Sequence, residues 1–327
     1  MDPSPNKRWF CFSLRTMLVV VTVIGALLGV LGWKVREAEK QKAAVAWVEG
    51  MGGWVDYSYE CDADRQWIYG RPSGPKWLRE LIGIDYFATV VSVTFRDTQV
   101  TDLTALADLT NLKMLHLYNT NVDDLTSLAD LTSLEELVLI DTEASDLSVV
   151  ASLKNLEHLD CTNTRLRNLS PMSSLTKLEF LCLHGPEITD LEPLVNLNGL
   201  KCLWLHYTSV GDLSPLAKLT NLEFLVLVAN PATDFSSLAK LKKLESLILS
   251  PTHVSDLSPL ADLTNLKNLR LTGAQVTDLS PLVNLKNLET LNLDGTQITA
   301  EDVAELQEAL PNCDIHYDRS PWPPPAR

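Results

Sequence analysis

The chain has 327 residues, of which 46% are hydrophobic, and its formal net charge is −15 at pH 7. This length and this apolar content allow a continuous hydrophobic core. The acidic excess argues against sequence-independent binding to nucleic acid, because such binding requires Lys and Arg to neutralise phosphates. We therefore expect no nucleic-acid partner.

An apolar segment follows an N-terminal tail of residues 1–16. Residues 17–33 read MLVVVTVIGALLGVLGW without a charge, which is near the minimum length of a transmembrane helix. A cleaved signal peptide and a buried helix are the alternatives, but no convincing small-x-small cleavage site follows the apolar core. The segment therefore predicts a single-pass anchor that contacts the lipid bilayer.

The sequence around this anchor bears on two further properties, its orientation in the membrane and its association with a second anchor. Basic residues flank both of its ends, so the positive-inside count does not decide the orientation. A short tail before a first apolar segment favours repeats on the non-cytoplasmic side of the cell membrane. Gly25 and Gly29 have the Gly-x-x-x-Gly spacing that allows close helix approach, and hence a homodimer, although glycine is common in membrane helices generally.

Residues 34–89 are expected to form a juxtamembrane helix and an N-terminal cap. The stretch KVREAEKQKAAVAWVEG (34–50) is rich in helix formers, and a glycine pair follows it. Residues 54–59 alternate like a strand, and a short helix is expected over 76–82. Because an open sheet edge invites unwanted pairing, this block is expected to cover the first edge of the sheet described next.

Residues 90–312 repeat one pattern every 22 residues. Val90 begins the first unit, and the first leucine of each later unit recurs in register at Leu112, Leu134, Leu156, Leu178, Leu200, Leu222, Leu244, Leu266 and Leu288. About ten such units predict a repeat architecture. No unit can bury its leucines alone, so neighbouring units are expected to stack.

Each unit contains a short strand followed by a turn. In the unit from Leu200, alternation places Leu203 and Leu205 inward and Trp204 outward, and stacked units form a parallel sheet. The return half contains Ser-Pro pairs such as Ser214-Pro215, where Ser suits an N-cap and Pro a first helical position. An aspartate recurs two residues before the Ser-Pro position in most units and is interpreted as a turn cap rather than a carboxylate array.

The unit reads Leu-x-x-Leu-x-Leu-x-x-Thr/Asn-x-Val/Ile-x-Asp-Leu-Ser/Thr-Pro-Leu-x-x-Leu and resembles the leucine-rich repeat of the bacterial internalin-like subclass. The resemblance implies an α/β solenoid: a horseshoe with short parallel strands on its concave face and 3₁₀ or short helical turns on its convex face. The subclass has Asn where this chain mostly has Thr. A Thr hydroxyl is expected to replace part of the hydrogen bonding that the Asn amide provides inside the coil.

The end of the chain departs from the repeat. Thr299 precedes an acidic first turn and is expected to cap a helix that ends near Leu310. Residues 313–317 are expected to add a last edge strand, and the proline-rich tail SPWPPPAR (320–327) is not expected to pack regularly. Residues 313–327 are thus the edge strand and tail.

The sequence contains no Walker loop, Gly-x-Ser-x-Gly elbow, His-Glu-x-x-His helix or kinase motif set, so we expect neither an enzyme nor a cofactor. Its six cysteines have no disulfide or zinc-ribbon spacing and are expected to be free thiols. His184 and His206 lie near Cys182 and Cys202, all predicted to face outward. A flat strand surface does not converge four ligands, so no metal site is predicted, and a metal-dependent activity remains an alternative.

The outward positions of the strands form a contiguous apolar surface with polar residues toward both ends. Such a surface is typical of a binding site, although it also suits contact with a second copy. The predicted partner-binding residues are Tyr118, Phe180, His184, Trp204, His206, Phe224, Val226, Ile248 and Arg270. The sequence therefore predicts a membrane-anchored, non-enzymatic module that binds a protein partner on its concave face, with a self-associating envelope scaffold as the alternative.

Overall fold

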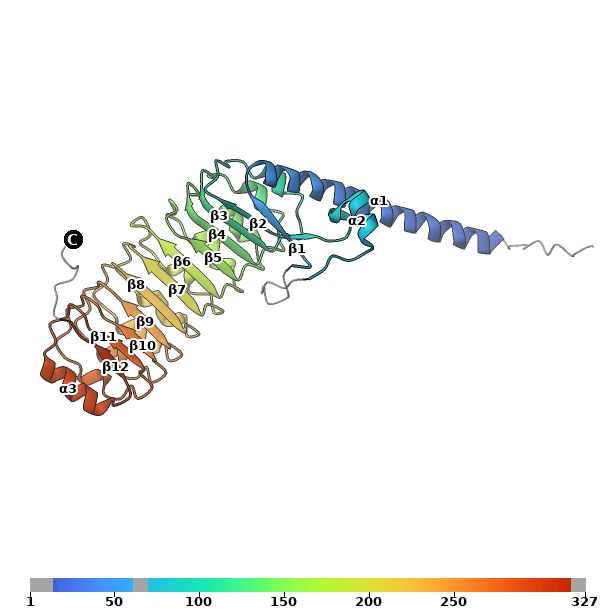
Figure 1. Cartoon of the computed structure of the whole chain (residues 1–327). Helices are drawn as coiled ribbons and strands as arrows, with labels where there is room; N and C mark the ends of the chain where they lie inside the picture. The colour runs from blue at the N-terminus through green and yellow to red at the C-terminus, as the bar shows by residue number, and fades with distance from the viewer. Residues whose placement is uncertain (1–13, 61–69, 319–327) are drawn as a thin grey trace, which may run out of the picture.

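The computed structural model describes residues 14–60 and 70–318. Its first helix, α1 (Leu14–Gly50), is continuous over 37 residues, so the apolar segment and the juxtamembrane helix are parts of one helix. No Pro or Gly lies between Trp33 and Val48, and the polar stretch there favours helix. Figure 1 shows the first half of α1 projecting from the body and its second half lying against the cap.

The cap covers the first edge of the sheet, as predicted. Strand β1 (Trp54–Tyr57) pairs antiparallel with β2 (Val90–Arg96), and between them lie α2 (Lys76–Ile82) and the 3₁₀ helix η1 (Ile84–Tyr86). The second half of α1 joins the core through buried apolar side chains and through Trp47, whose ring packs edge-on against that of Phe95 at 5.7 Å.

The sheet has twelve strands in the order of the chain, and every pair from β2 onward is parallel. The later strands are β3 (Met114–Thr120), β4 (Glu136–Thr142), β5 (His158–Cys161), β6 (Phe180–His184), β7 (Cys202–His206), β8 (Phe224–Val228), β9 (Ser246–Leu249), β10 (Asn268–Arg270), β11 (Thr290–Asn292) and β12 (Asp314–His316). Equivalent residues of successive repeats face each other, as Leu203 faces Leu225. The predicted solenoid with parallel strands is confirmed.

Short 3₁₀ helices form the opposite side of the solenoid. They are η2 (Thr104–Leu106), η3 (Thr126–Leu128), η4 (Ser148–Ser152), η5 (Ser170–Ser174), η6 (Glu192–Leu194), η7 (Ser214–Lys218), η8 (Ser236–Lys240), η9 (Ser258–Leu260) and η10 (Ser280–Leu282). The repeat leucines fill the space between these turns and the strands in one continuous core.

The turn aspartates act as predicted, but the expected role of serine is wrong. Asp212 accepts a hydrogen bond at 2.8 Å from the Ser214 backbone N–H, and this bond lowers the pKa of the Asp212 carboxyl. Ser214 is the first residue of η7 rather than its N-cap, and its side chain does not cap the helix. The aspartate supplies the cap because it lies two residues earlier, outside the turn.

The threonine column confirms partial replacement of the asparagine amide. The hydroxyls of Thr164 and Thr296 donate to the carbonyls of Cys161 and Leu293 at 2.9 and 2.7 Å. The buried Thr252 hydroxyl has no partner among the described residues. The Asn230 amide makes two hydrogen bonds: it donates to the Thr208 hydroxyl and accepts from the Ala232 backbone N–H.

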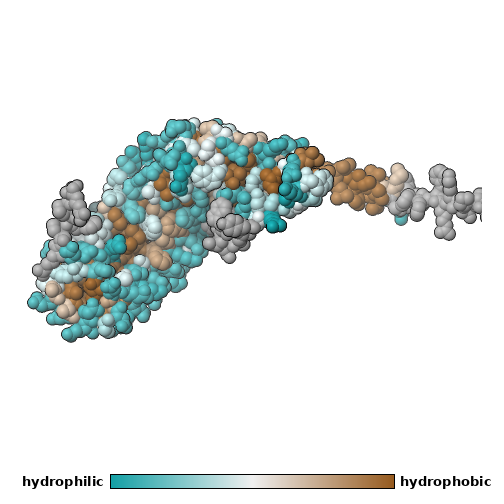
Figure 2. Space-filling model, viewed as in Figure 1, coloured by the Kyte–Doolittle hydropathy of each residue, from teal (hydrophilic) through white to brown (hydrophobic). Residues whose placement is uncertain are grey.

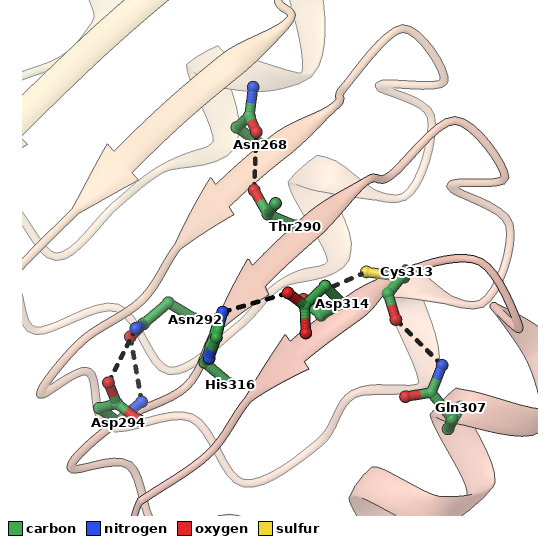
Figure 3. Close-up of polar contacts among 8 residues, drawn as sticks. All are labelled: Asn268, Thr290, Asn292, Asp294, Gln307, Cys313, Asp314 and His316. Carbon is green, nitrogen blue, oxygen red and sulfur yellow. Dashed lines mark hydrogen bonds and ion pairs between the residues drawn. The ribbon is translucent and has the colours of Figure 1, made fainter.

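The C-terminal end closes as expected. Thr299 and Asp302 form a reciprocal capping box at the start of α3 (Ala300–Ala309). Gln307 of α3 donates to the carbonyl of Leu310. It also donates to the carbonyl of Cys313, the residue before the last strand, and so ties the helix to that strand (Figure 3). The predicted edge strand is confirmed as the slightly shorter β12.

Candidate binding surface on the concave face

The in-register sheet arranges the outward side chains in columns that run across the strands. One column contains Phe180, Cys202 and Phe224; the next contains Cys182, Trp204, Val226, Ile248 and Arg270; a third begins with His184 and His206. Eight of the nine predicted residues therefore occupy adjacent strands, β6 to β10. Tyr118 lies apart on β3, where the Arg96 guanidinium stacks over its ring at 4.5 Å.

Aromatic rings of this surface contact one another in a chain. The His158 and Phe180 rings stack at 4.1 Å, the Phe180 and Trp204 rings meet edge-on at 5.3 Å, and the Trp204 and His206 rings meet edge-on at 5.9 Å. Trp204 is 38% exposed and Phe224 is 42% exposed. Large apolar groups are thus presented to solvent on a rigid support.

Other members of the same columns are covered by their neighbours. Cys182 is only 2% exposed, so its predicted outward orientation does not make it accessible, and Val226 is also buried. The Cys182 thiol lies 3.2 Å from the Thr162 hydroxyl, and burial raises its pKa to about 12. Burial also raises the pKa of Cys202 to about 11. Both thiols therefore stay protonated at neutral pH and are poor nucleophiles.

His184 and His206 lie side by side on β6 and β7. Burial, and secondarily the neighbouring His184, lower the pKa of His206. The part of the chain that the structure describes contains no group of three or more His, Cys, Asp or Glu side chains placed to hold a metal ion. The pair instead packs with aromatic neighbours, and the His184 and Tyr207 rings lie 5.3 Å apart.

A groove of about 840 Å³ continues this surface beyond the ends of strands β6 to β10. Its lining includes His184, Pro186, Tyr207, Pro231, Pro251 and His253. This groove is not among the features predicted from the sequence, and His158 and Tyr207 are not among the predicted partner-binding residues. His184 lines the groove and lies beside His206, whose ring contacts that of Trp204. The groove and the aromatic residues therefore form one continuous surface.

The loops beside the groove differ from the other loops in the residue at one backbone position, and this difference can be found in the sequence. At one position of each loop the chain is left-handed, and the residues there are Asp97, Asn119, Asp141, Asn163, Gly185, Tyr207, Ala229, Gly273 and Gly295. Asp, Asn and Gly tolerate this conformation, whereas Tyr207 (φ 55°) and Ala229 (φ 50°) do not favour it. Pro251, at the equivalent position, cannot adopt a positive φ. These three successive departures mark the groove.

Polar residues enclose the apolar centre. Toward the N-terminus, His116 pairs with Glu136 at 2.9 Å, and toward the C-terminus Arg270 is exposed. Lysine–glutamate pairs such as Lys201–Glu179, at 2.8 Å, line the edge at which the strands begin. Figure 2 shows hydrophobic residues gathered on the strand face in the middle of the solenoid, with hydrophilic residues around them.

Comparisons with known proteins agree with this architecture. The profile of the leucine-rich-repeat family (Leucine Rich repeats, 2 copies) matches residues 154–196. No curated protein sequence matches the chain. Among solved structures, an internalin (InlF) from Listeria monocytogenes is 26% identical, with a TM-score of 0.54, over 73% of this chain and 87% of that one.

Two further structures share the fold. The functional domain of InlJ from Listeria monocytogenes is 21% identical, with a TM-score of 0.55, over 71% of this chain and 55% of that one. The ectodomain of the plant receptor kinase GASSHO1/SCHENGEN3 from Arabidopsis thaliana, in complex with CASPARIAN STRIP INTEGRITY FACTOR 2, is 21% identical, with a TM-score of 0.54, over 72% of this chain and 30% of that one. The chain is a leucine-rich-repeat protein of the internalin-like type, with a long apolar helix preceding its repeats.

Proposed function

We propose that the protein is a non-enzymatic, membrane-anchored module that binds a protein partner on the concave face of its solenoid. Leucine-rich repeats are typical of protein–protein interaction modules, and the finer assignment rests on one observation. Phe180, Trp204 and Phe224 lie together on neighbouring strands, and the Trp204 and Phe224 side chains are exposed at the centre of a polar rim. Contiguous exposed aromatic residues of this kind mark interaction sites.

The mechanism would be rigid presentation. The strands that carry Trp204 and Phe224 are held on both sides by paired neighbours, so little conformational entropy is lost when a partner covers them. The groove lined by Tyr207, Pro231 and Pro251 extends the contact along the loops and suits an extended segment of the partner. The acidic net charge of −15 favours partners with basic residues around an apolar centre.

The proposed anchor is the first half of α1. Among the described residues, α1 is the helix that is long and apolar enough to cross a membrane, and none of its most apolar stretch is buried in the protein. We assign the repeats to the non-cytoplasmic side of the membrane. An epitope placed after Arg327 tests this orientation: protease treatment of intact cells should remove it without lysis, whereas protection that persists in spheroplasts would place the repeats in the cytoplasm.

The binding surface is tested with the double variant Trp204→Ser/Phe224→Ser. A photo-crosslinking amino acid at the half-buried Val228, beside this pair, should capture a discrete partner in the wild type and fail to do so in the double variant. The matched control carries two changes at exposed residues in the turns that follow η7 and η8, Thr220→Ser and Lys242→Ser, and should retain the crosslink. A crosslink that persists in the concave double variant excludes this face. A crosslink to a second copy of the chain supports the scaffold alternative instead.

A further inference from the structure

Helix α2 presents its apolar residues to solvent. Trp77 is 65% exposed and Leu81 is 73% exposed, and none of the seven residues of α2 is buried. Trp77 and Leu81 are four residues apart, so they lie on one side of the helix, while Lys76, Arg79 and Glu80 lie on the other. This is an amphipathic helix whose apolar side lacks a cover within the described protein.

One residue on the polar side of α2, Arg79, bonds to the turn that precedes the helix. The Arg79 guanidinium donates to the backbone carbonyls of Pro72 and Ser73 at 2.9 and 3.2 Å. The Ser73 hydroxyl donates to the Phe87 carbonyl at 2.8 Å, which ties this turn to the rest of the cap. The apolar side of α2 therefore cannot turn inward without breaking the Arg79 bonds. The outward position of Trp77 and Leu81 is therefore a property of the folded cap.

The cap connects α2 firmly to α1. From α2 the chain passes through Gly83 (φ 101°) into η1, where the Tyr86 hydroxyl donates to the Glu39 carboxylate. Gln41 of α1 donates to the Asp85 carboxylate at 3.0 Å and to the Ala88 carbonyl at 2.9 Å. These bonds hold η1, and with it α2, against α1 a short distance beyond the apolar stretch.

The location of α2 matches the surface of a bilayer spanned by α1. The apolar stretch of α1 ends near Trp33, and Glu39 follows six residues later, about 9 Å along the helix. The polar headgroup zone on each side of a bilayer is about 5–8 Å thick. Figures 1 and 2 show α2 at the end of the cap from which the apolar half of α1 projects. The exposed basic residues Lys34 and Arg36 lie on α1 between the end of the apolar stretch and Glu39.

We propose that α2 is a second membrane contact, in which Trp77 and Leu81 insert into the interface of the bilayer that α1 spans. The lipid class that fits is a phospholipid with an anionic headgroup, because the exposed basic residues Lys34 and Arg36 directly follow the apolar stretch of α1. This inference rests on the proposed membrane anchoring of α1. Two contacts restrict rotation of the solenoid about α1, so the concave face keeps a fixed orientation relative to the membrane.

The test uses the full chain in vesicles that contain anionic phospholipid and lipids brominated in the upper acyl chain, which quench nearby tryptophans. The fluorescence of one tryptophan is the difference between the wild type and a variant in which that residue is Phe. Trp77→Phe reports on the α2 contact, Trp33→Phe on the anchor, and Trp204→Phe is the remote control. We expect the Trp77 and Trp33 components to fall at least twofold with brominated lipid and the Trp204 component to stay unchanged. Replacing Leu81 with Ser should at least halve the Trp77 quenching and leave that of Trp33 unchanged.

The outcomes separate the two proposals. Quenching of Trp33 without quenching of Trp77 overturns the α2 contact and leaves the anchor standing, including the case in which α2 is covered by a second copy. Absence of quenching at both positions, with protein that does not float with the vesicles, overturns the anchor and the α2 contact together. Equal Trp77 quenching in vesicles with and without anionic phospholipid would contradict the proposed lipid class.

Discussion

The middle of the concave face and its C-terminal end have the same backbone fold, but the outward side chains are apolar in the middle and polar at the C-terminal end. In the middle, the Trp204 ring contacts those of Phe180 and His206, and both Trp204 and Phe224 are exposed. At the C-terminal end, Asn268 accepts from the Thr290 hydroxyl at 2.6 Å, Asn292 bonds Asp294, and Asp314 pairs with His316 at 3.3 Å (Figure 3). The polar side chains at the C-terminal end bond to one another, whereas the apolar side chains in the middle are exposed to solvent.

The fold of the solenoid does not depend on which side chains occupy the outward columns of the sheet. Inward leucines such as Leu205 and Leu291 are fully buried in both regions and set the same register. The outer side chains can therefore change while the fold remains, which is why repeat folds host many partners. The predictions below separate the contributions of the two sides of the sheet.

The largest expected effect comes from an inward residue. Leu205→Ala removes a fully buried side chain between two stacked repeats and should lower the free energy of unfolding by about 2–5 kcal/mol. Urea denaturation measures it, with the outward variant Phe224→Ala from the next repeat as control. Equal losses in the two variants would contradict the separation of core and surface.

A smaller effect is expected at the left-handed position beside the groove. Tyr207→Asn replaces a residue that disfavours φ 55° with one that tolerates it, and should raise the free energy of unfolding by about 1 kcal/mol. The reciprocal change Gly295→Ala, at φ 68° in the C-terminal region, should lower it by a similar amount. Thermal unfolding of both variants decides the point. If Tyr207→Asn destabilises the protein, ring packing against His184 outweighs backbone strain.

The third prediction concerns pH and the middle of the face. The folded-state pKa of His206 lies below its ordinary value of 6.5, because burial disfavours the charged ring. The unfolded chain therefore binds the proton more readily, so the contribution of His206 to stability is lost as pH falls below about 6.5. His206→Gln should flatten the stability profile in that window, and His316→Gln at the exposed C-terminal edge serves as the control. An unchanged profile in His206→Gln would refute the assignment.

The smallest expected effect lies in the turns, which are alike in both regions. Backbone hydrogen bonds lower the folded-state pKa of Asp212, Asp234 and Asp256, so their contribution is present above an ordinary carboxyl pKa and is lost as pH falls through the folded values. Asn168 accepts the same bond from Ser170 at 2.9 Å without titrating there. The triple Asp→Asn variant should keep its stability at neutral pH and unfold at lower pH than the wild type. Loss of stability at neutral pH would show that the charge, rather than the hydrogen bond, caps the turn.

Much of the architecture was predictable because it follows from local periodicity. The 22-residue register predicted the parallel sheet and its inward leucines, and Thr299 with Asp302 predicted the start of α3. The Ser-Pro pairs predicted the wrong N-cap residue, because the acceptor is Asp212, two residues before Ser214. The groove does not follow from the repeat pattern, because the loop position occupied by Tyr207, Ala229 and Pro251 lies outside the leucine and strand positions that define the pattern.

The sequence by itself determined which side of the sheet each side chain occupies, since alternation along a strand and an in-register repeat leave no freedom there. Only the tertiary structure decided how exposed each side chain is. Cys182 and Trp204 occupy the same outer column, yet one is buried and the other exposed, because exposure depends on the size of the residues in the neighbouring strands. The same holds for α2, whose apolar side faces outward because Arg79 bonds to the preceding turn at Pro72, and that turn is bonded to Phe87 through Ser73.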